Sequence, residues 1–439
     1  MAPSLVPVDR AGLPGTGRAG GALPSGRVYL WTADPSRPLG GTVTAAVVPL
    51  LRLDNQGAGR GRLWGRFVRV RNDGVVSRPD PATGSARPVL IGDAQPNADG
   101  DFLFDPRRGG GPIDDATVRA PASQADYVEA THFGEVNTYF HLDRIAAYVD
   151  HLLQELGAPS LPRVTAVVAA HTAVTEEEGG NRDGVRRRDR WVPFQGGHYR
   201  LPSHRYTDAW EYTPVSPDGE IHLGPGRSAL QFGALVEAAG GPYQHNASHN
   251  GAILYHEYGH HINRHTADFR ANARRPPHLQ SNRKIPMDEG TCDYWTAAML
   301  GTPHIWAWHR RHDDQEVHPR SLTSSKTMAD YDRRPGADPH LNGTIWAAAL
   351  WDLRTRLGET DPAGGQNTDL LVLHALRVLG QYGDPAPEAA ADRTAGARES
   401  YAAGLTALLQ ADEQLNAGRN RTAIVAAFAK RGIEPTPSV

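Results

Sequence analysis

The chain has 439 residues, of which 39% are hydrophobic and 22% are charged, and its formal net charge is −3 at pH 7. This length allows a large core divided over two or more lobes. The near balance of charges gives no indication of a nucleic-acid partner, and no apolar run is long enough for membrane insertion. The single cysteine, Cys292, excludes an intrachain disulfide framework.

The N-terminal region is expected to contain an arm and a small β-rich module. Residues 1–30 are rich in Gly, Pro, Ala and Arg without periodicity, which predicts a flexible arm. Within 31–120, short β-type runs separated by turn residues predict a small β-rich module, followed by a linker that begins near residue 77. The first ten residues lack the basic start and apolar block of a signal peptide, so no export signal is visible.

Residues 121–265 are expected to form an N-terminal catalytic lobe. Apolar residues recur at three- and four-residue steps from Ala125 to Leu156 and predict a long helix, and 165–170 is a predicted buried strand. The segment 175–190 is expected to be a loop. Its acidic run, 176–178, offers the carboxylate oxygens that calcium prefers, but a solvated loop is the favoured interpretation.

Helical patterns dominate the second half of the chain, and residues 266–439 are expected to form a helical C-terminal lobe. The predicted helices lie at about 228–239, 248–264, 287–300, 343–357, 367–381, 394–410 and 420–431. A β-rich first half followed by a helical second half predicts an α+β fold with a cleft between two lobes.

The pattern H-E-x-x-H, from His256 to His260, indicates a zinc site. On a helix the two histidines lie one turn apart on one face, as two ligands of one zinc ion must. Glu257 lies beside them and could act as general base toward a zinc-activated water. Because the chain contains 20 histidines, a chance match has to be weighed against this interpretation.

A catalytic zinc needs a third protein ligand and one open position. The extended pattern H-E-x-x-H-x-x-G-x-x-H fails, because Asn263 and Thr266 occupy its Gly and last His positions. A carboxylate on a later helix remains, and Glu289 is the candidate ligand. Asp293, one turn further, could accept the second N–H of a ligating histidine. Acidic residues are common near the start of any helix, where the helix dipole favours them. This alternative would explain Glu289 without a metal, but it explains Asp293 less well.

His340 immediately precedes a strongly apolar predicted helix and could donate to an oxyanion. Taken alone, a histidine in a surface loop is the favoured interpretation. Asp338 could orient His340, with Asp332 as its rival. The run Glu220–Leu223 is a candidate edge strand on which an extended peptide could add, which makes His222 a candidate substrate-binding residue.

Together these stretches resemble the thermolysin-like zinc peptidases and, more closely, their fungalysin branch. The run from Asp288 to Asp293, D-E-G-T-C-D, is similar to the fungalysin pattern G-E-G-x-x-D and differs from it at the first position. The run His340–Gly343, followed by Trp346 and Trp351, is similar to the segment that carries a transition-state histidine. The resemblance implies a two-lobed zincin-type fold, with the active-site helix between a β-rich half and a mainly helical lobe.

The resemblance also implies a zinc-dependent endopeptidase that acts on peptides or proteins, with calcium as a second candidate cation and an extracellular location. It implies these roles: zinc ligands His256, His260 and Glu289, general base Glu257, transition-state histidine His340, and contact with a substrate carbonyl by Arg320.

Two alternatives stay open at this point. Gly196–Tyr199 stands where thermolysin-like enzymes carry an Asn-Ala pair that aligns the substrate, and no Tyr lies between His261 and Asp288. The missing Asn-Ala pair and the absent signal peptide favour a catalytically idle zinc-peptidase fold that serves as a binding or structural module, whereas the intact set of Glu257, Glu289, Asp293 and His340 argues against it. A zinc aminopeptidase is less favoured, because no run similar to G-x-M-E-N is present to hold a free N-terminus.

Overall fold

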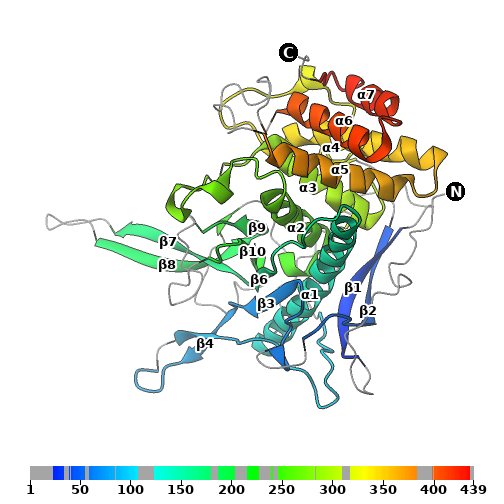
Figure 1. Ribbon diagram of the computed structural model, residues 1–439. Coiled ribbons are helices and arrows are strands. Elements are labelled where there is room, and N and C mark those ends of the chain that lie inside the picture. The colour runs from blue at the N-terminus through cyan, green and yellow to red at the C-terminus, as the bar shows by residue number, and fades with distance from the viewer. Residues whose placement is uncertain are drawn as a thin grey trace.

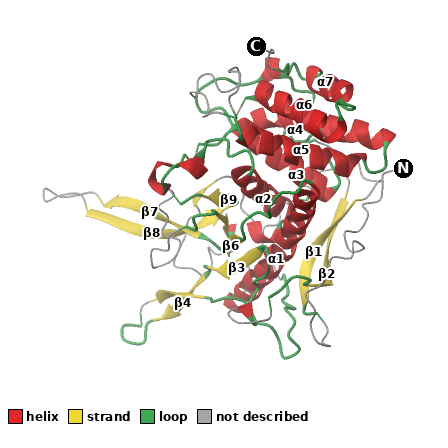
Figure 2. Ribbon diagram, viewed as in Figure 1, coloured by secondary structure: helices red, strands yellow, loops and turns green. Residues whose placement is uncertain are grey.

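In the computed structural model, small sheets and one long helix make up the first half of the chain, and helices make up the second half (Figures 1 and 2). The described residues are 23–33, 39, 41–54, 59–84, 86–106, 123–178, 186–202, 215–226, 239–240, 246–281, 283–308, 317–382, 398 and 400–435.

A four-stranded sheet forms the centre of the N-terminal half. Its strands, in spatial order, are β3 (Val68–Asn72), β6 (Val164–Val168), β10 (Glu220–Leu223) and β9 (Gly197–Arg200). β3 and β10 run parallel to β6, whereas β9 runs antiparallel to β10. Every residue of β6 is buried, as the β-branched sequence V-T-A-V-V requires of a central parallel strand. β3 and β9 are therefore the two edge strands of this sheet within the described part of the chain.

The long helix α1 (Gln124–Glu155) connects β3 to β6 and packs against both the sheet and β1. Parallel strands need such a crossover, and the helix supplies it. The side-chain amide of Asn137 on α1 accepts a hydrogen bond from the Tyr29 backbone N–H at 2.9 Å and donates one to the Ser248 carbonyl at 2.8 Å. One buried side chain thus joins β1, α1 and the segment that leads into the next helix.

Smaller strand pairs surround this centre. They are β1 (Ser25–Ala33) with β2 (Gly41–Pro49), β4 (Val75–Pro79) with β5 (Ala86–Leu90), and β7 (His171–Glu178) with β8 (Arg186–Gln195) and the short β11 (Ala239–Gly240). The β7–β8 ribbon projects away from the rest of the molecule (Figure 1). Its backbone register sets residues 176–178 opposite residues 186–188.

The second half consists of helices. The α-helices are α2 (Gly251–His265), α3 (Pro286–Leu300), α4 (Pro339–Thr360), α5 (Gly364–Gly380), α6 (Tyr401–Asn416) and α7 (Arg421–Ala429), with short 3-10 turns η5 (Ala247–His249), η6 (Asn272–Arg274), η7 (Pro277–Leu279) and η8 (Met328–Asp330). α4 to α7 stack at the end of the molecule opposite the β4–β5 hairpin, and α2 lies between this stack and the sheet (Figure 1).

One buried carboxylate ties helices of both halves together. Asp369 of α5 is 1% exposed and accepts the hydroxyls of Tyr148 on α1 at 2.6 Å and Tyr294 on α3 at 2.5 Å. Arg354 of α4 donates to both of its oxygens, at 3.1 and 3.2 Å. A charge buried this deeply is tolerated because its oxygens are so fully hydrogen-bonded.

The predicted α+β, two-lobed zincin-type fold, with the active-site helix between the lobes, is confirmed. The predicted loop at 175–190 is wrong, because β7 and β8 occupy both described ends of it. The predicted linker also contains the β4–β5 hairpin. The predicted helix at 228–239 lies almost wholly outside the described residues, and the lobe boundaries stay predictions. Among the described residues, no helix has the length and apolarity needed to cross a bilayer.

Candidate active site

The helix α2 presents the two histidines of the H-E-x-x-H pattern. Its start is capped by Asn250, whose side chain accepts from the backbone N–H groups of Ala252 at 2.9 Å and Ile253 at 3.4 Å. The rings of His256 and His260 lie on one face with their centroids 5.1 Å apart. Both imidazoles therefore face the same neighbouring helix.

That neighbour is α3, which packs closely because of a glycine. A Cβ atom added at Gly259 would lie 2.7 Å from the Cα of Cys292. The absence of a side chain at this position brings the backbone of α3 directly onto α2. Glu289 and Asp293, one turn apart on α3, then both reach the histidines of α2.

Glu289 provides the point on which the imidazoles converge. Its Oε2 lies 3.1 Å from Nε2 of His256 and 3.5 Å from Nε2 of His260. Zinc–ligand bonds of about 2.0–2.1 Å at tetrahedral angles place neighbouring ligand atoms roughly 3.3–3.4 Å apart. Each of the two imidazoles thus lies at about this ligand-to-ligand spacing from Oε2 of Glu289.

The other oxygen of Glu289 supports the same interpretation. The carboxylate is 1% exposed, and its Oε1 has no hydrogen-bond donor within the described residues. The ammonium of Lys284 lies 3.7 Å away. Burial alone would raise the pKa of Glu289, but the imidazoles of His340 and His260 and the hydrogen bond from His256 hold it well below its usual range. A buried carboxylate that stays ionised is suited to hold a cation.

Each histidine of α2 is oriented through its second ring nitrogen. Nδ1 of His256 lies 2.9 Å from Oδ1 of Asp293, and Nδ1 of His260 lies 3.1 Å from Oδ1 of Asp288. A carboxylate at Nδ1 fixes the ring so that Nε2 points to the metal position. Asp293 was expected in this role, whereas Asp288 was missed. The signal that could have found it is its place at the position where the fungalysin pattern has Gly.

Arg320 lies behind Asp293. Its Nη2 and Nε donate to the two carboxylate oxygens of Asp293 at 2.6 and 3.1 Å, and the guanidinium lies 5.5 Å from the ring centroid of Trp306. Burial raises the pKa of Asp293, but Arg320 and His256 together hold it below its usual value. The observed contacts of Arg320 are with the protein, and its predicted contact with a substrate carbonyl stays a prediction.

His340 lies in the first turn of α4 and reaches the same carboxylate. Its Nε2 is 3.1 Å from Oε2 of Glu289, and its Nδ1 is 2.8 Å from Oδ1 of Asp338. Asp338 also caps α4 by accepting from the His340 backbone N–H. The hydrogen bond from His340 lowers the pKa of Asp338 to about 2. The rival residue Asp332 is instead bonded to Arg334.

Glu257 faces the edge strand β9. It is 6% exposed, and a Cβ atom added at Gly197 would lie 2.8 Å from its Oε1. Gly196 precedes with φ +79°, a left-handed conformation that favours glycine. The two glycines of the run Gly196–Tyr199 therefore let the edge of the sheet approach the carboxylate of Glu257.

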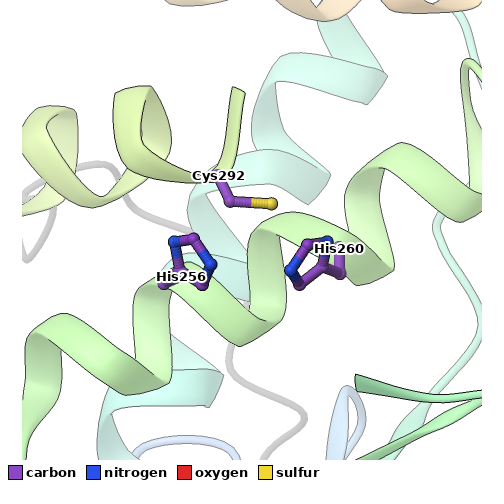
Figure 3. Close-up of side chains that lie close together, drawn as sticks. All are labelled: His256, His260 and Cys292. Carbon is purple, nitrogen blue, oxygen red and sulfur yellow. The ribbon is translucent and has the colours of Figure 1, made fainter. Parts of the chain in front are cut away.

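Cys292 contributes a thiol to the same face. Figure 3 shows its sulfur reaching from α3 toward the gap between the rings of His256 and His260. The potential ligand atoms of these three residues lie within 4.8 Å of one another, as do those of His256, Glu289 and His340. Burial raises the pKa of the Cys292 thiol well above its usual value, so the carboxylate of Glu289 is the better ligand at neutral pH.

The predicted substrate role of His222 loses its basis. β10 pairs with β6 on one side and β9 on the other, so it is an inner strand. His222 is 0% exposed, and its Nε2 lies 2.9 Å from Oε2 of Glu220. The edge available to an extended peptide is β9. His261 hydrogen-bonds with the Tyr199 hydroxyl and the Pro162 carbonyl.

The geometry agrees with a comparison against protein families. The model of the family described as Fungalysin metallopeptidase (M36) matches residues 17–435, nearly the whole chain. No curated protein matches the chain. The fungalysins are thermolysin-like gluzincins that hydrolyse peptide bonds with a metal ion, and the convergence of His256, His260 and Glu289 supplies a matching donor set. The chain belongs to the fungalysin metallopeptidase family.

Proposed function

We propose that the protein is a zinc-dependent endopeptidase in which His256, His260 and Glu289 hold the zinc ion. The observation that carries the proposal is the convergence of two imidazole Nε2 atoms on Oε2 of a buried carboxylate whose Oε1 has no hydrogen-bond donor in the described structure. Two nitrogen ligands and one carboxylate are a donor set that catalytic zinc uses. When bound, zinc polarises the scissile carbonyl and lowers the pKa of a water molecule.

Glu257 acts as general base and then as general acid. It takes a proton from the attacking water, whose oxygen forms the new bond to the carbonyl carbon. It then passes that proton to the leaving amine as the C–N bond breaks. Its position between α2 and Gly197 supports this role, because a peptide lying along β9 would present its carbonyl beside this carboxylate.

His340 donates a hydrogen bond to the oxygen that becomes negative in the transition state. Burial lowers its pKa, but the charge of Glu289 and the hydrogen bond to Asp338 raise it above the usual value. Asp338 fixes the ring through Nδ1 and thus directs Nε2 inward. Donors of this kind stabilise developing charge that the ground state lacks.

The substrate is an extended peptide that adds to the edge of the sheet. β9 is the only strand of the four-stranded sheet, among the described residues, that combines an unpaired edge with contact to Glu257. Main-chain hydrogen bonds to such an edge hold a peptide without regard to its sequence. This mode of binding suits cleavage within a chain rather than at a free N-terminus.

The test combines metal analysis with hydrolysis of internally quenched peptides blocked at both ends. We expect one zinc ion per chain, cleavage that a chelator abolishes, and zinc retained with activity lost in Glu257→Gln. The matched control is Glu359→Gln, an exposed residue of α4. A Glu257→Gln variant with full activity would overturn the assignment of the general base.

The same assay separates the alternatives. Bound zinc without hydrolysis of any peptide or casein-type substrate would favour a catalytically idle binding module. Hydrolysis confined to substrates with a free N-terminus would favour an aminopeptidase.

A further inference from the structure

A cavity of about 140 Å³ opens beside the catalytic groups. Its lining combines Glu257 and His260 of α2, the residues of β9, and residues of the segment between α2 and α3. A single water needs roughly 10–15 Å³ of such volume, so this space is large enough for a side chain. Because Glu257 is part of the lining, a side chain held there belongs to a substrate residue close to the scissile bond.

Positive charge predominates on the lining of this cavity. Three carboxylates line it, and the two that the proposed mechanism does not use are engaged. Asp288 accepts from Asn263 at 2.6 Å and lies beside His260, while Asp268 accepts from backbone N–H groups of η6. Five basic side chains face these three: Arg200, Arg264, Arg270, Arg283 and Lys284. The described lining therefore carries more positive than negative charge.

The guanidinium group of Arg264 indicates most directly which chemical group the cavity binds. It lies one turn after His260 on α2, and its Nη2 donates to the Pro217 carbonyl at 2.9 Å. Its Nε and Nη1 are buried and have no acceptor within the described residues. Buried guanidinium N–H groups without acceptors are costly, and a carboxylate is the group that matches their planar fork.

Lys284 provides a second cation nearer to the metal position. Its ammonium lies 3.4 Å from Nε2 of His340 and 3.7 Å from Oε1 of Glu289, and 48% of its side chain is exposed. Lys284 is therefore a second, more exposed cation of the lining that can attract a substrate carboxylate.

We propose that this cavity is a specificity pocket for an acidic side chain, Asp or Glu, of a substrate residue adjacent to the scissile bond. Arg264 binds the carboxylate and Lys284 attracts it. A strand added to β9 presents alternate side chains to opposite faces, so every second residue of the peptide can face this cavity. The inference rests on the proposed endopeptidase function and specifies its substrate class.

The experiment uses internally quenched peptides that are acetylated and amidated, so that the side chain supplies the carboxylate and the chain ends do not. Glu, Gln or Lys is placed in turn at each of the two positions on either side of the cut bond. At one position we expect kcat/KM for Glu to exceed that for Gln on the order of tenfold, with Lys lowest. Raising the ionic strength should reduce this preference.

Substitutions in the cavity test which residues produce the preference for Glu over Gln. In Arg264→Gln and in Lys284→Gln, the ratio of kcat/KM for Glu over Gln should fall toward one, and Arg264→Lys should retain part of it. The control is Arg356→Gln, an exposed residue of α4, in which the ratio should stay as in the wild type. If Arg264→Gln does not fold, the exposed Lys284 still tests the inference.

A binding measurement keeps this inference separate from the proposed catalysis. Glu257→Gln protein loaded with zinc is titrated with the Glu and Gln peptides, and the Glu peptide should bind on the order of tenfold more tightly. Equal cleavage and equal binding of the two peptides would overturn the pocket and leave the endopeptidase standing. Tighter binding of the Glu peptide without cleavage of any peptide by the wild type would overturn the endopeptidase and leave the pocket standing.

Discussion

Gly290 of α3 and Gly343 of α4 meet backbone to backbone. A Cβ atom added at Gly290 would lie 2.3 Å from the carbonyl oxygen of Gly343, and one added at Gly343 would lie 2.8 Å from the backbone nitrogen of Gly290. The two helices cross at this contact because neither residue has a side chain. Glu289 and His340, which lie next to the crossing in sequence, are thereby brought to within 3.1 Å of each other.

Replacing Gly290 with Ala should therefore damage both stability and metal binding. The added methyl group would force α3 and α4 apart at a cost of about 1–3 kcal/mol, and it would displace Glu289. We expect a lower midpoint of thermal unfolding and a higher zinc dissociation constant. Gly358→Ala, on α4 with nothing within 4 Å of the added atom, is the control and should be neutral or stabilising by up to about 1 kcal/mol. Equal behaviour of the two variants would contradict the close contact.

Removing the charge of Asp293 should weaken zinc binding. Asn at this position still accepts a hydrogen bond but no longer compensates the buried guanidinium of Arg320. Loss of such a carboxylate beside a metal-ligating histidine raises the zinc dissociation constant about 10–100-fold. Competition with a chromophoric chelator measures this constant, and the exposed Asp99→Asn is the control.

Asp288→Asn tests the second carboxylate in the same assay. His260 would keep an oxygen acceptor at Nδ1, so we expect a smaller loss of zinc affinity than in Asp293→Asn. A zinc affinity equal to that of the wild type would show that Asp288 does not support the metal site through His260.

His340→Phe should separate catalysis from metal binding. The phenyl ring keeps the shape of the side chain but cannot donate to the developing oxyanion, so kcat should fall by about a hundredfold, while one zinc ion per chain is retained. Asp338→Asn, which leaves the ring of His340 in place without its anionic partner, should lower kcat by less. Loss of zinc from His340→Phe would instead assign His340 to the ligand set, since its ligand atom also lies close to those of Glu289 and His256.

His141 should make the protein sensitive to mild acid. It is 1% exposed, its Nε2–H donates to the Tyr29 carbonyl, and its Nδ1 accepts from the Tyr255 hydroxyl. Burial lowers its pKa from 6.5 to about 3. Since the folded pKa lies below the unfolded one, this group stabilises the fold above pH 6.5 and loses that contribution as the pH falls toward 3.

The measurement is the free energy of unfolding at pH 7.5 and at pH 5.5. Between these values the wild type should lose about 1.4 kcal/mol more than His141→Gln. The other buried histidines contribute equally to both proteins, so the difference isolates His141. An identical pH dependence of the two proteins would contradict the neutral, buried state of this ring.

The metal-binding helices could be predicted because their signals are local. The spacing of His256 and His260 places both on one face of any helix, and Glu289 and Asp293 repeat that relation on the next one. Such features depend on a few neighbouring residues and not on the path of the whole chain. The exact helix starts were predicted less well. Helices were expected from 248 and 343, whereas α2 begins after the cap Asn250 and α4 begins after the cap Asp338, so His340 lies inside α4.

The arrangement of strands could not be predicted in the same way. Whether β9 or β10 forms the edge depends on which of the two strands pairs with β6. β6 ends more than 28 residues before β9 begins, so this pairing cannot be read from neighbouring residues. The β7–β8 ribbon was missed because Glu and Arg have little intrinsic preference for strands. The contact of Asp288 with His260 depends on how α3 is rotated about its axis, which the sequence of α3 alone does not determine.

Asp369 also affects how the two halves of the molecule can move relative to each other. Its carboxylate binds α1, which belongs to the sheet-bearing half, as well as α3 and α4, which carry Glu289 and His340. Separating Tyr148 from Asp369 would cost a hydrogen bond to a charged group, about 1.5–3 kcal/mol, while Arg354 would still compensate the charge. A rotation of the sheet-bearing half relative to the helices that carry Glu289 and His340 is therefore opposed at this point, although it lies outside the candidate active site.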